Sequence, residues 1–438
     1  MGPLEGIRVI EVSHALCAWA GKLMADMGAD VIVVEPPGGS AMRTYGPFAD
    51  DVEGPENSLY WWHYNTSKRG VVLDRASSAG EAAFADLVAS ADVLLGAEPV
   101  ASYRSADDRL ITVSMTAPSP ITDLTILAAG GPVHASGYDD HTLPPIRGGG
   151  NQGFHTASHW ATIATLIAIL EREESGEGQH IDVDAVAASQ VTTEVSTYGW
   201  LTCGYFAERQ TGRHAANVRT SPTQLRCADG LYVNSGVIAR RGPEFEATLR
   251  WLDEVGLRDT FDMTVFLEMG AQRAVLTMAD FANDPEAQLI AEAARAAQAY
   301  VAEHVSAYDF FISAQRHGLT AGIVYAPDEV LADPHFIARE WPTPVEHPEH
   351  GRTVTYAGQP YRFTGTPTGI RHRAPRLGEH QAIVGQGSPH LVGDERLESR
   401  NRSVETRRVP PGSRRVPMAS PKLDDEGCVL GTDTSARA

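Results

Sequence analysis

The chain has 438 residues, which is too long for one ordinary hydrophobic core, so two domains are expected. Its formal net charge of −20 argues against a nucleic acid as partner, because binding phosphate needs a basic surface. No run approaches the ~18–20 apolar residues of a membrane span. Four scattered cysteines without CxxC pairing indicate neither a disulfide framework nor a zinc ribbon. We expect a cytoplasmic protein that holds no metal and binds neither nucleic acid nor membrane.

Strand and helix patterns alternate in the first part of the chain. Short β-branched runs bounded by turn residues indicate strands, and apolar residues at helical spacing indicate helices between them. The pattern predicts strands at 6–12, 30–37, 92–97 and 109–115, and helices at 16–29 and 78–91. A further strand, followed by a helix, is predicted to start at HIDVDAVAA. Strands that alternate with helices predict an α/β fold with a Rossmann-like parallel sheet.

A nicotinamide dinucleotide is excluded as the ligand of this sheet. Glu35, at the end of the second predicted strand, imitates the acid that holds a dinucleotide ribose. The fingerprint also needs GxGxxG at the first turn, because only glycine lets the backbone approach the pyrophosphate. That turn reads SHALCAWAG here, so the dinucleotide interpretation fails.

A longer helix is predicted over 155–174, directly after the glycine-rich stretch GGGNQGF. Its apolar stripe is expected to consist of Ile163, Leu166, Ile167 and Leu170. Near its start, His155 and His159 have the spacing that places two metal ligands on one helix face. Neither a third ligand nor a water-activating glutamate accompanies them in the sequence, so helix-capping or pocket-lining roles are expected instead.

Two single residues and one pair of tryptophans have two interpretations each. His155 is a candidate general base, because an unperturbed imidazole has a pKa near ~6.5, or else a structural histidine with satisfied hydrogen bonds. Cys17, at a predicted helix start, is either a thiolate stabilised by the helix dipole or a small buried residue packed on the sheet. The Trp61–Trp62 pair is expected in the core or in a subunit interface.

The order of predicted strands and helices changes at about residue 222. A predicted hairpin, TQLRCADGLYVNSGV, is followed by helices at GPEFEATLRWLDEVG and over the alanine-rich 279–304. From about residue 385, Arg, Ser, Pro and Gly dominate and periodicity vanishes. We expect a large Rossmann-like domain over 1–215, a smaller α+β domain over 222–330, a return to the large domain over 331–384, and a disordered tail over 385–438.

Six blocks of sequence resemble, in order, one known family. They read PLEGIRVIEVSHALCA, LMADMGADVIVVEPPGG, NTSKRGVVLD, EREESGEGQHIDV, ADPHFIARE with VEHPEHGR, and APRLGEH. The chain resembles the class III CoA-transferases, which include formyl-CoA transferase, carnitine CoA-transferase and α-methylacyl-CoA racemase. The resemblance implies a large domain built from both chain ends, a small domain between them, and a dimer of interlocked rings.

The resemblance also implies a reaction and its substrates. Coenzyme A is moved from an acyl-CoA thioester to a carboxylic acid, so CoA is a substrate and no covalently bound cofactor is expected. In the family, an aspartate near the start of the helix at 155 attacks the thioester and becomes a mixed anhydride, then an enzyme-bound thioester. Glycine-flanked backbone N–H groups at a helix start would stabilise the oxyanion.

This sequence departs from the family pattern at the nucleophile. Counting back from SGEGQ, the place of the aspartate falls at Gly153 or Phe154, and the chain has no Asp or Glu between Asp140 and Glu171. We expect no adduct in the peptide 148–172. If the chain turns over alone, His155 is the group expected to move a proton.

Other family positions are retained. The resemblance implies that CoA is bound by His14, Arg43, Lys68, Arg69, Leu73, Asp74 and Arg104. For Lys68 and Arg69 the alternative is a solvated turn. His14 ends the first predicted strand, where open α/β sheets bind their ligands.

Three functions stay open at this point. The first is a CoA-transferase that acts on acyl-CoA with a relocated nucleophile or an altered reaction. The second is racemase or isomerase chemistry at an acyl-CoA α-carbon, which needs an acid and a base on opposite faces. The third is a non-catalytic subunit of a heteromeric CoA-transferase. We expect a homodimer, or a heterodimer with a paralogue.

Overall fold

The computed structural model describes residues 2–105, 108–217, 221–235 and 239–385. The predicted tail over 385–438 lies, from residue 386 onward, outside the described residues. No helix among the described residues is long and apolar enough to cross a membrane.

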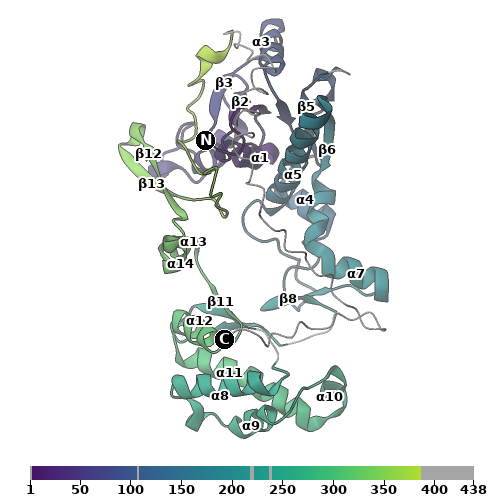
Figure 1. The fold of residues 1–438 in the computed structure, drawn as a ribbon, viewed down its shortest axis with the longest axis vertical. Helices are drawn as coiled ribbons and strands as arrows, with labels where there is room; N and C mark the ends of the chain where they lie inside the picture. Colours follow the sequence, from purple (N-terminus) through teal and green to yellow (C-terminus); the bar gives the residue numbers. More distant parts are fainter. Residues whose placement is uncertain (1, 106–107, 218–220, 236–238, 386–438) are drawn as a thin grey trace, which may run out of the picture. The chain divides into compact units, whose positions relative to one another are not determined.

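Six parallel strands form the main sheet, in the order β3-β2-β1-β4-β5-β6 (Figure 1). Their bounds are β1 Arg8–Val12, β2 Asp30–Glu35, β3 Arg69–Val72, β4 Val93–Gly96, β5 Ile111–Thr116 and β6 His180–Asp184. This is the strand order of a doubly wound sheet. From β1 the chain adds β2 and β3 on one side and then β4, β5 and β6 on the other, so the order of the strands reverses between β1 and β4. The predicted α/β class with a parallel sheet is confirmed, and β3, only four residues long, is an addition to the predicted strands.

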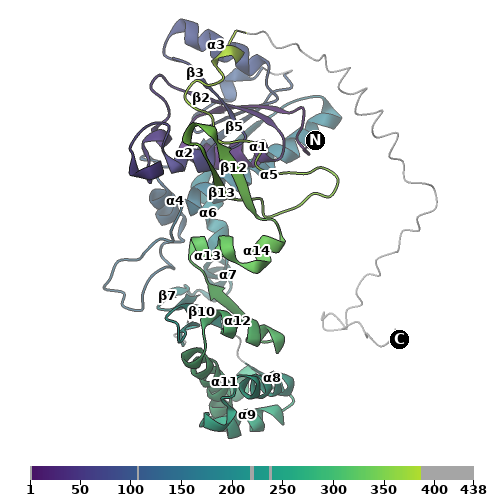
Figure 2. The same ribbon diagram turned by 90° about the vertical axis from the view of Figure 1, so that its left-hand side faces the viewer.

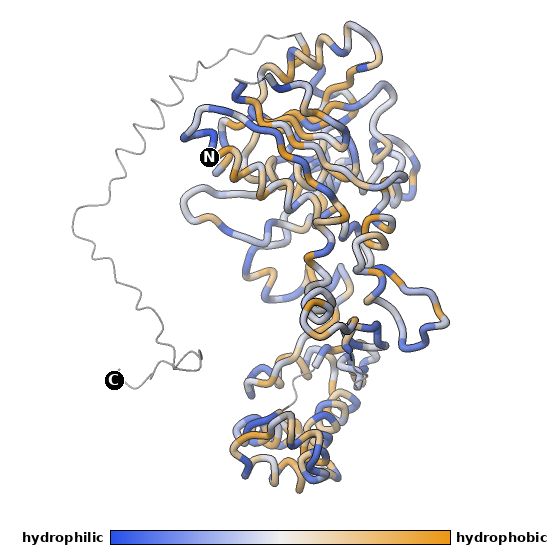
Figure 3. The backbone as a smooth tube through the Cα atoms, turned by 90° about the vertical axis from the view of Figure 1, so that its right-hand side faces the viewer, coloured by the Kyte–Doolittle hydropathy of each residue, from blue (hydrophilic) through white to orange (hydrophobic). Residues whose placement is uncertain are grey.

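Both faces of this sheet are buried, and the two-residue period of a strand divides its side chains between them. Val9, Val31 and Val33 belong to one core cluster, together with residues of α1 Ala15–Asp26 and α5 Gln152–Ser175. Ile10, Ile32 and Val34 belong to another, together with residues of α3 Ser78–Ala89. The strands therefore read as continuous apolar runs, seen as orange stretches of the tube in Figure 3.

The expected apolar stripe of α5 is wrong as a core-facing surface. Ile163, Ile167 and Leu170 are exposed, and Leu166 is only partly buried. The small side chains Ala157, Ala161, Thr165 and Ala168 face the core instead. Small residues let α5 pack closely against α1, and this close packing turns the larger side chains outward.

The remaining elements follow in chain order. Around the main sheet lie α2 Leu59–Tyr64, α4 Asp123–Gly130 and α6 Ala185–Ser189. Next along the chain come α7 Glu194–Cys203 and the hairpin of β7 Glu208–Gln210 with β8 Arg213–Ala216, which lie away from the parallel strands (Figure 1). A three-stranded sheet consists of β9 Gln224–Arg226, β10 Tyr232–Ser235 and β11 Ala321–Val324. Its helices are α8 Gly242–Glu254, α9 Thr264–Ala271, α10 Met278–Asn283, α11 Pro285–His304 and α12 Ala307–Arg316.

This second group of elements has its own core. Val233 of β10, Phe245 and Trp251 of α8, and Phe310 of α12 are buried in one cluster that contains no residue of the parallel sheet. The helix predicted over 279–304 is two helices, because Pro285 starts a new one at its first position.

The chain then returns to the main sheet. After α13 Pro327–Ala332 and α14 Pro334–Ala338, the antiparallel pair of β12 Pro342–His347 and β13 Arg352–Ala357 follows (Figure 2). Val345 and Tyr356 of this pair are buried in the same cluster as α1. The carbonyl of Pro375 accepts hydrogen bonds from both Arg43 and Trp61 Nε1. The two ends of the described chain thus share one core.

Candidate functional site

The reversal point of the sheet is occupied by His14, directly after β1. Its Nδ1 accepts a hydrogen bond from Leu16 N at 3.1 Å, so His14 caps α1 and Nε2 is the protonated nitrogen. Burial lowers the pKa of His14, and the nearby carboxylate of Glu98, which follows β4, opposes this shift. His14 and Glu98 therefore flank the place where doubly wound sheets bind their ligands.

Arg43 lies beside the end of β2, at the same carboxyl edge of the sheet. Its guanidinium is buried and bonds Glu35, the last residue of β2, through two nitrogens at 2.7 and 2.8 Å. It also stacks on Trp61, with Cζ 3.9 Å from the ring centre. Glu35, which imitated a ribose acid in the sequence, is thus a partner of Arg43.

Lys68 is also buried, and its Nζ lies 2.7 Å from Oε2 of Glu11. It donates further hydrogen bonds to the Ala18 carbonyl and to Asn65 Oδ1. Burial lowers the pKa of Lys68 and raises that of Glu11. A solvated turn is therefore the wrong alternative for Lys68, because its ammonium is enclosed by protein groups.

The other predicted CoA contacts are divided between two edges. Leu73 and Asp74 follow β3 and lie at the carboxyl edge, with Leu73 buried and Asp74 exposed. Arg69 begins β3 and pairs with Asp30, the first residue of β2, at the opposite edge. Arg104 donates a hydrogen bond to the Gly178 carbonyl, just before β6 begins, and also belongs to that edge.

A cluster of aromatic and histidine side chains surrounds the start of α5. The Tyr64 hydroxyl lies 2.8 Å from His155 Nε2, and the Asn151 amide donates to the hydroxyls of both Tyr60 and Tyr64 at 2.9 Å. With the Tyr64 oxygen accepting from Asn151, its proton is directed at His155. The ring of Trp19 lies 4.6 Å from that of His155. The helix start therefore presents a continuous hydrogen-bonded chain.

Burial makes this chain neutral. It lowers the pKa of His155 to about 4, with His159 adding to the shift and Asp123 opposing it. It also raises the pKa values of Tyr60 and Tyr64. The pKa near ~6.5 assumed for His155 as a general base is therefore wrong. His155 stays unprotonated at neutral pH and accepts a proton only weakly.

The histidine pair at the start of α5 is accounted for by protein partners. His159 Nε2 accepts a hydrogen bond from Trp19 Nε1 at 3.2 Å, while His155 is bonded to Tyr64. The described residues contain no group of three or more His, Cys, Asp or Glu side chains able to hold a metal ion.

At Gly153, one of the two positions where the resemblance places the family nucleophile, a carboxylate from another helix is present. The Gly153 N–H donates to Oδ1 of Asp123, the first residue of α4, at 2.7 Å. A Cβ placed on Gly153 would lie 3.2 Å from that oxygen. Phe154, the other candidate position, is buried in the core. Reading along the sequence missed Asp123 because it lies 30 residues before Gly153.

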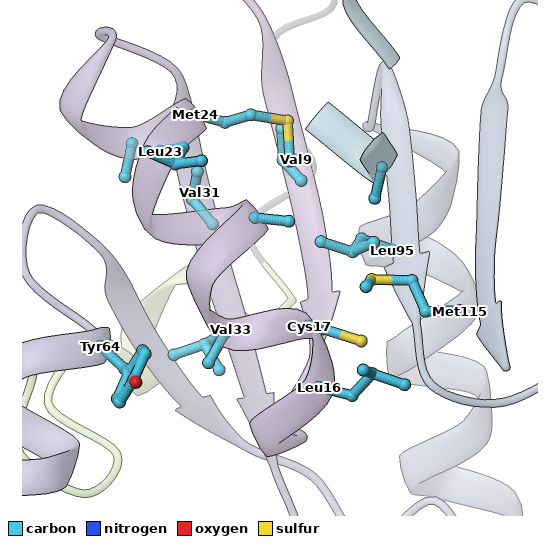
Figure 4. Packing of buried hydrophobic residues seen from close by; sticks show 14 of the residues in the cluster. Val9, Leu16, Cys17, Leu23, Met24, Val31, Val33, Tyr64, Leu95 and Met115 are labelled. Carbon is cyan, nitrogen blue, oxygen red and sulfur yellow. The ribbon is translucent and has the colours of Figure 1, made fainter. Parts of the chain in front are cut away.

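Tyr64 and Asn151 were missed as well. The only signal near Tyr64 in the sequence is the Trp61–Trp62 pair, which is expected in the core or in a subunit interface. That assignment is confirmed for Trp61 and Trp62, which are buried in the main core. Cys17 is buried between α1 and the sheet, near Leu95 and Met115 (Figure 4), and burial raises its pKa well above the ordinary value. Its reading as a packed residue is confirmed.

Comparison with known proteins identifies the class. The family model of CoA-transferase family III matches residues 4–381. Succinyl-CoA:(R)-benzylsuccinate CoA-transferase subunit BbsE of Thauera aromatica is 28% identical, over 89% of this chain and 96% of the relative. Succinyl-CoA:mesaconate CoA-transferase of Haloarcula hispanica is 26% identical, over 91% of this chain and 100% of the relative.

A solved structure agrees with both. A CAIB/BAIF family protein from Brucella suis matches with a TM-score of 0.68 and 25% identity, over 87% of this chain and 98% of that one. The chain belongs to CoA-transferase family III. The family resemblance in the sequence is confirmed, and with it the general activity, the transfer of CoA from acyl-CoA thioesters.

Proposed function

We propose that the chain binds an acyl-CoA at the carboxyl edge of the sheet and moves its CoA to a carboxylic acid without a nucleophile at position 153. One observation carries this proposal, the meeting of the reversal point and the start of α5. The Ser158 hydroxyl donates to the Leu16 carbonyl at 3.0 Å, so the first turns of α5 lie beside His14. An acyl-CoA bound at the reversal point would therefore place its thioester near the start of α5.

Succinyl-CoA is the donor that we propose, with a dicarboxylic acid as acceptor. The names of the relatives from Thauera aromatica and Haloarcula hispanica support this choice, since both specify succinyl-CoA and the acceptors are benzylsuccinate and mesaconate. His14, Leu73 and Asp74 are proposed to contact CoA. Arg43 and Lys68 are buried, and we propose that their ion pairs with Glu35 and Glu11 stabilise the carboxyl edge without contacting CoA. Arg69 and Arg104 remain predicted contacts that their position at the opposite edge does not favour.

A second candidate is the non-catalytic subunit of a heteromeric CoA-transferase. Gly153 and Phe154 favour it, because neither candidate position of the family nucleophile carries a carboxylate. The relative from Thauera aromatica is itself named as a subunit. Racemase chemistry gains no such support, because His155 and Tyr64 are bonded to each other rather than placed on opposite faces.

We also propose a dimer, either of two copies or with a paralogue, in which the rings interlock. The exposed apolar side chains Ile163, Ile167 and Leu170 of α5 support a partner surface there. The proposed domains are those predicted from the sequence, 1–215 with 331–384 and 222–330 between them. Cys17, Cys203 and Cys227 are free thiols, which suits the cytoplasm.

Two measurements test the proposed function. Calorimetry with CoA and with succinyl-CoA should give saturable binding. The substitution His14→Asp should weaken this binding, because the new carboxylate repels the phosphates of CoA. Isotopically labelled succinate should exchange into succinyl-CoA when the purified chain is present. Failure to bind at millimolar CoA contradicts the proposal. Exchange that appears only after a paralogous chain is added favours the second candidate.

A further inference from the structure

We infer that Asp123 is the carboxylate nucleophile of this chain, in place of the aspartate that position 153 lacks. The inference rests on the proposed function, because it assigns a catalytic residue to the same CoA transfer. Its basis is a juxtaposition in space, since the Asp123 carboxylate lies beside the place of a Cβ on Gly153, together with the side chains of Ile126 and Leu127.

The first argument is the position of the carboxylate. Asp123 Oδ1 accepts the Gly153 N–H at 2.7 Å and lies 3.2 Å from the place of a Cβ on Gly153. The carboxylate at the start of α5 is therefore present, although it comes from α4 instead of from α5.

The second argument concerns the two oxygens of Asp123. Oδ1 is held by the buried N–H of Gly153, whereas Oδ2 faces Arg147 Nη1 at 2.9 Å. The Asp123 side chain is 6% exposed and that of Arg147 is 40% exposed. Oδ2 thus lies on the side that opens to solvent through Arg147, which also donates to the carbonyls of Gly148 and Gly150. We assign the attack to Oδ2, which requires the exposed Arg147 side chain to release this oxygen.

Tyrosine and histidine side chains lie near this carboxylate. Burial raises the pKa values of Tyr60 and Tyr64 and lowers that of His155, and the charge of Asp123 adds a smaller upward contribution to each, so Asp123 lies near the hydrogen-bonded chain at the start of α5. In this chain the Tyr60 hydroxyl accepts from Asn151, and its own proton can be donated to an oxyanion that forms beside it.

The reaction balances without a further reagent. Oδ2 attacks the thioester carbonyl carbon, the C–S bond breaks, and CoA leaves as its thiolate. The thiolate attacks Cγ of Asp123, the Cγ–O bond to the acyl group breaks, and the donor acid leaves as a carboxylate. The acceptor carboxylate then attacks Cγ and displaces the thiolate, which attacks the acceptor acyl carbon. Acceptor acyl-CoA leaves and the Asp123 carboxylate is restored.

Trapping of the enzyme-bound thioester tests this assignment. The full chain is incubated with succinyl-CoA, alone and with any partner chain, and borohydride then reduces a thioester of aspartate to the alcohol. Trypsin separates the peptide 110–147, which contains Asp123, from 148–172, which contains Gly153. The expected product is a reduced Asp123 in 110–147, with 148–172 unmodified.

Two variants complete the test. Asp123→Asn keeps an acceptor for the Gly153 N–H, so it should fold, bind CoA within a few-fold, and lose the adduct with at least about a thousandfold of the exchange rate. Asp140→Asn alters an exposed carboxylate on the same peptide and should change neither. If Asp123→Asn does not fold, the adduct in the unmodified chain decides.

Each other result overturns the assignment in a distinguishable way. Exchange with an adduct on another residue of this chain, or full exchange in Asp123→Asn, refutes Asp123 but leaves the proposed transfer intact. An adduct on the partner chain alone refutes Asp123 and favours the non-catalytic subunit. Absence of exchange and of any adduct, with and without a partner, refutes both the assignment and the transfer.

Discussion

The Nζ of Lys68 lies 2.7 Å from Oε2 of Glu11, and neither side chain is exposed. Gly21 of α1 makes room for this pair, because a Cβ placed on it would lie 1.7 Å from Glu11 Oε2 and 3.1 Å from Lys68 Nζ. A side chain at position 21 must therefore separate or displace two buried charges.

The first prediction is that Gly21→Ala destabilises the chain. Helix propensity alone favours alanine by about 1 kcal/mol. Disrupting a buried ion pair costs about 3–5 kcal/mol, so the net loss in the free energy of unfolding is about 2–4 kcal/mol. Urea denaturation measures it. In a Glu11→Ala background the same substitution should cost much less, and an equal cost in both backgrounds would reject the clash.

The second prediction concerns pH. Burial lowers the pKa values of His63 and His155 to about 4, so both are neutral in the folded chain, whereas the unfolded chain protonates them near ~6.5. The unfolded state then binds more protons between these values, and the stability contributed by neutral histidines is lost as pH falls from about 6.5 to 4. Urea midpoints across this range should fall, and less steeply in His63→Gln and in His155→Gln. Unchanged slopes would show that other groups titrate.

The third prediction is that His155→Ala slows CoA exchange strongly and leaves CoA affinity within a few-fold. Its imidazole accepts the hydrogen bond of the Tyr64 hydroxyl and so fixes the hydrogen-bonded chain at the start of α5, and losing this contact is expected to cost about 10²–10³ in rate. Tyr64→Phe should produce a smaller loss. Exchange kinetics and calorimetry separate the two effects. A fully active His155→Ala would assign His155 to structure alone.

The fourth prediction concerns the outer face of α5. Ile167 and Leu170 are exposed apolar side chains, and an interface would bury them. A chain with Ile167→Glu and Leu170→Glu should lose its partner, because two buried charges oppose association. Multi-angle light scattering measures the mass. Leu289→Glu, at an exposed apolar position of α11, is the matched control and should keep the unmodified mass. A monomeric unmodified chain would contradict the proposed dimer.

The fifth prediction separates two cysteines. Cys17 is buried, and burial raises the pKa of its thiol well above the ordinary value, whereas Cys203 is exposed. Only thiolates react with iodoacetamide, so the folded chain should be alkylated at Cys203 long before Cys17. Peptide mass spectrometry measures both rates. Rapid alkylation of Cys17 would restore its interpretation as a reactive thiolate.

Much of the fold could be predicted from local patterns. The strands at 6–12 and 30–37 were evident because both faces of a parallel sheet are buried and its strands are continuously apolar. The orientation of α5 could not be predicted in this way. Its large apolar residues suggested a core stripe, but α1 requires small side chains for close packing, and Ala157 and Ala161 supply them.

Only those residues of the candidate site that lie close to a recognisable motif in the sequence could be predicted. His155 was found because it lies next to the glycine-rich stretch at a predicted helix start. Asp123 was not, because hydrogen bonding between its carboxylate and Gly153 N–H depends on how α4 packs beside α5. Lys68 was expected near solvent, since sequence gives its charge but not the carboxylate of Glu11 beneath it.

The shared carbonyl of Pro375 has a consequence for biosynthesis. Arg43 is buried, and one of its hydrogen bonds goes to an acceptor 332 residues further along the chain. At about 5–20 residues per second, roughly 15–70 s of translation separate the two residues. Until then the nascent N-terminal sheet exposes the surface that residues near Pro375 later cover. Completion of this domain on the ribosome must therefore wait for the last part of the described chain, and chaperones are expected to hold it in that interval.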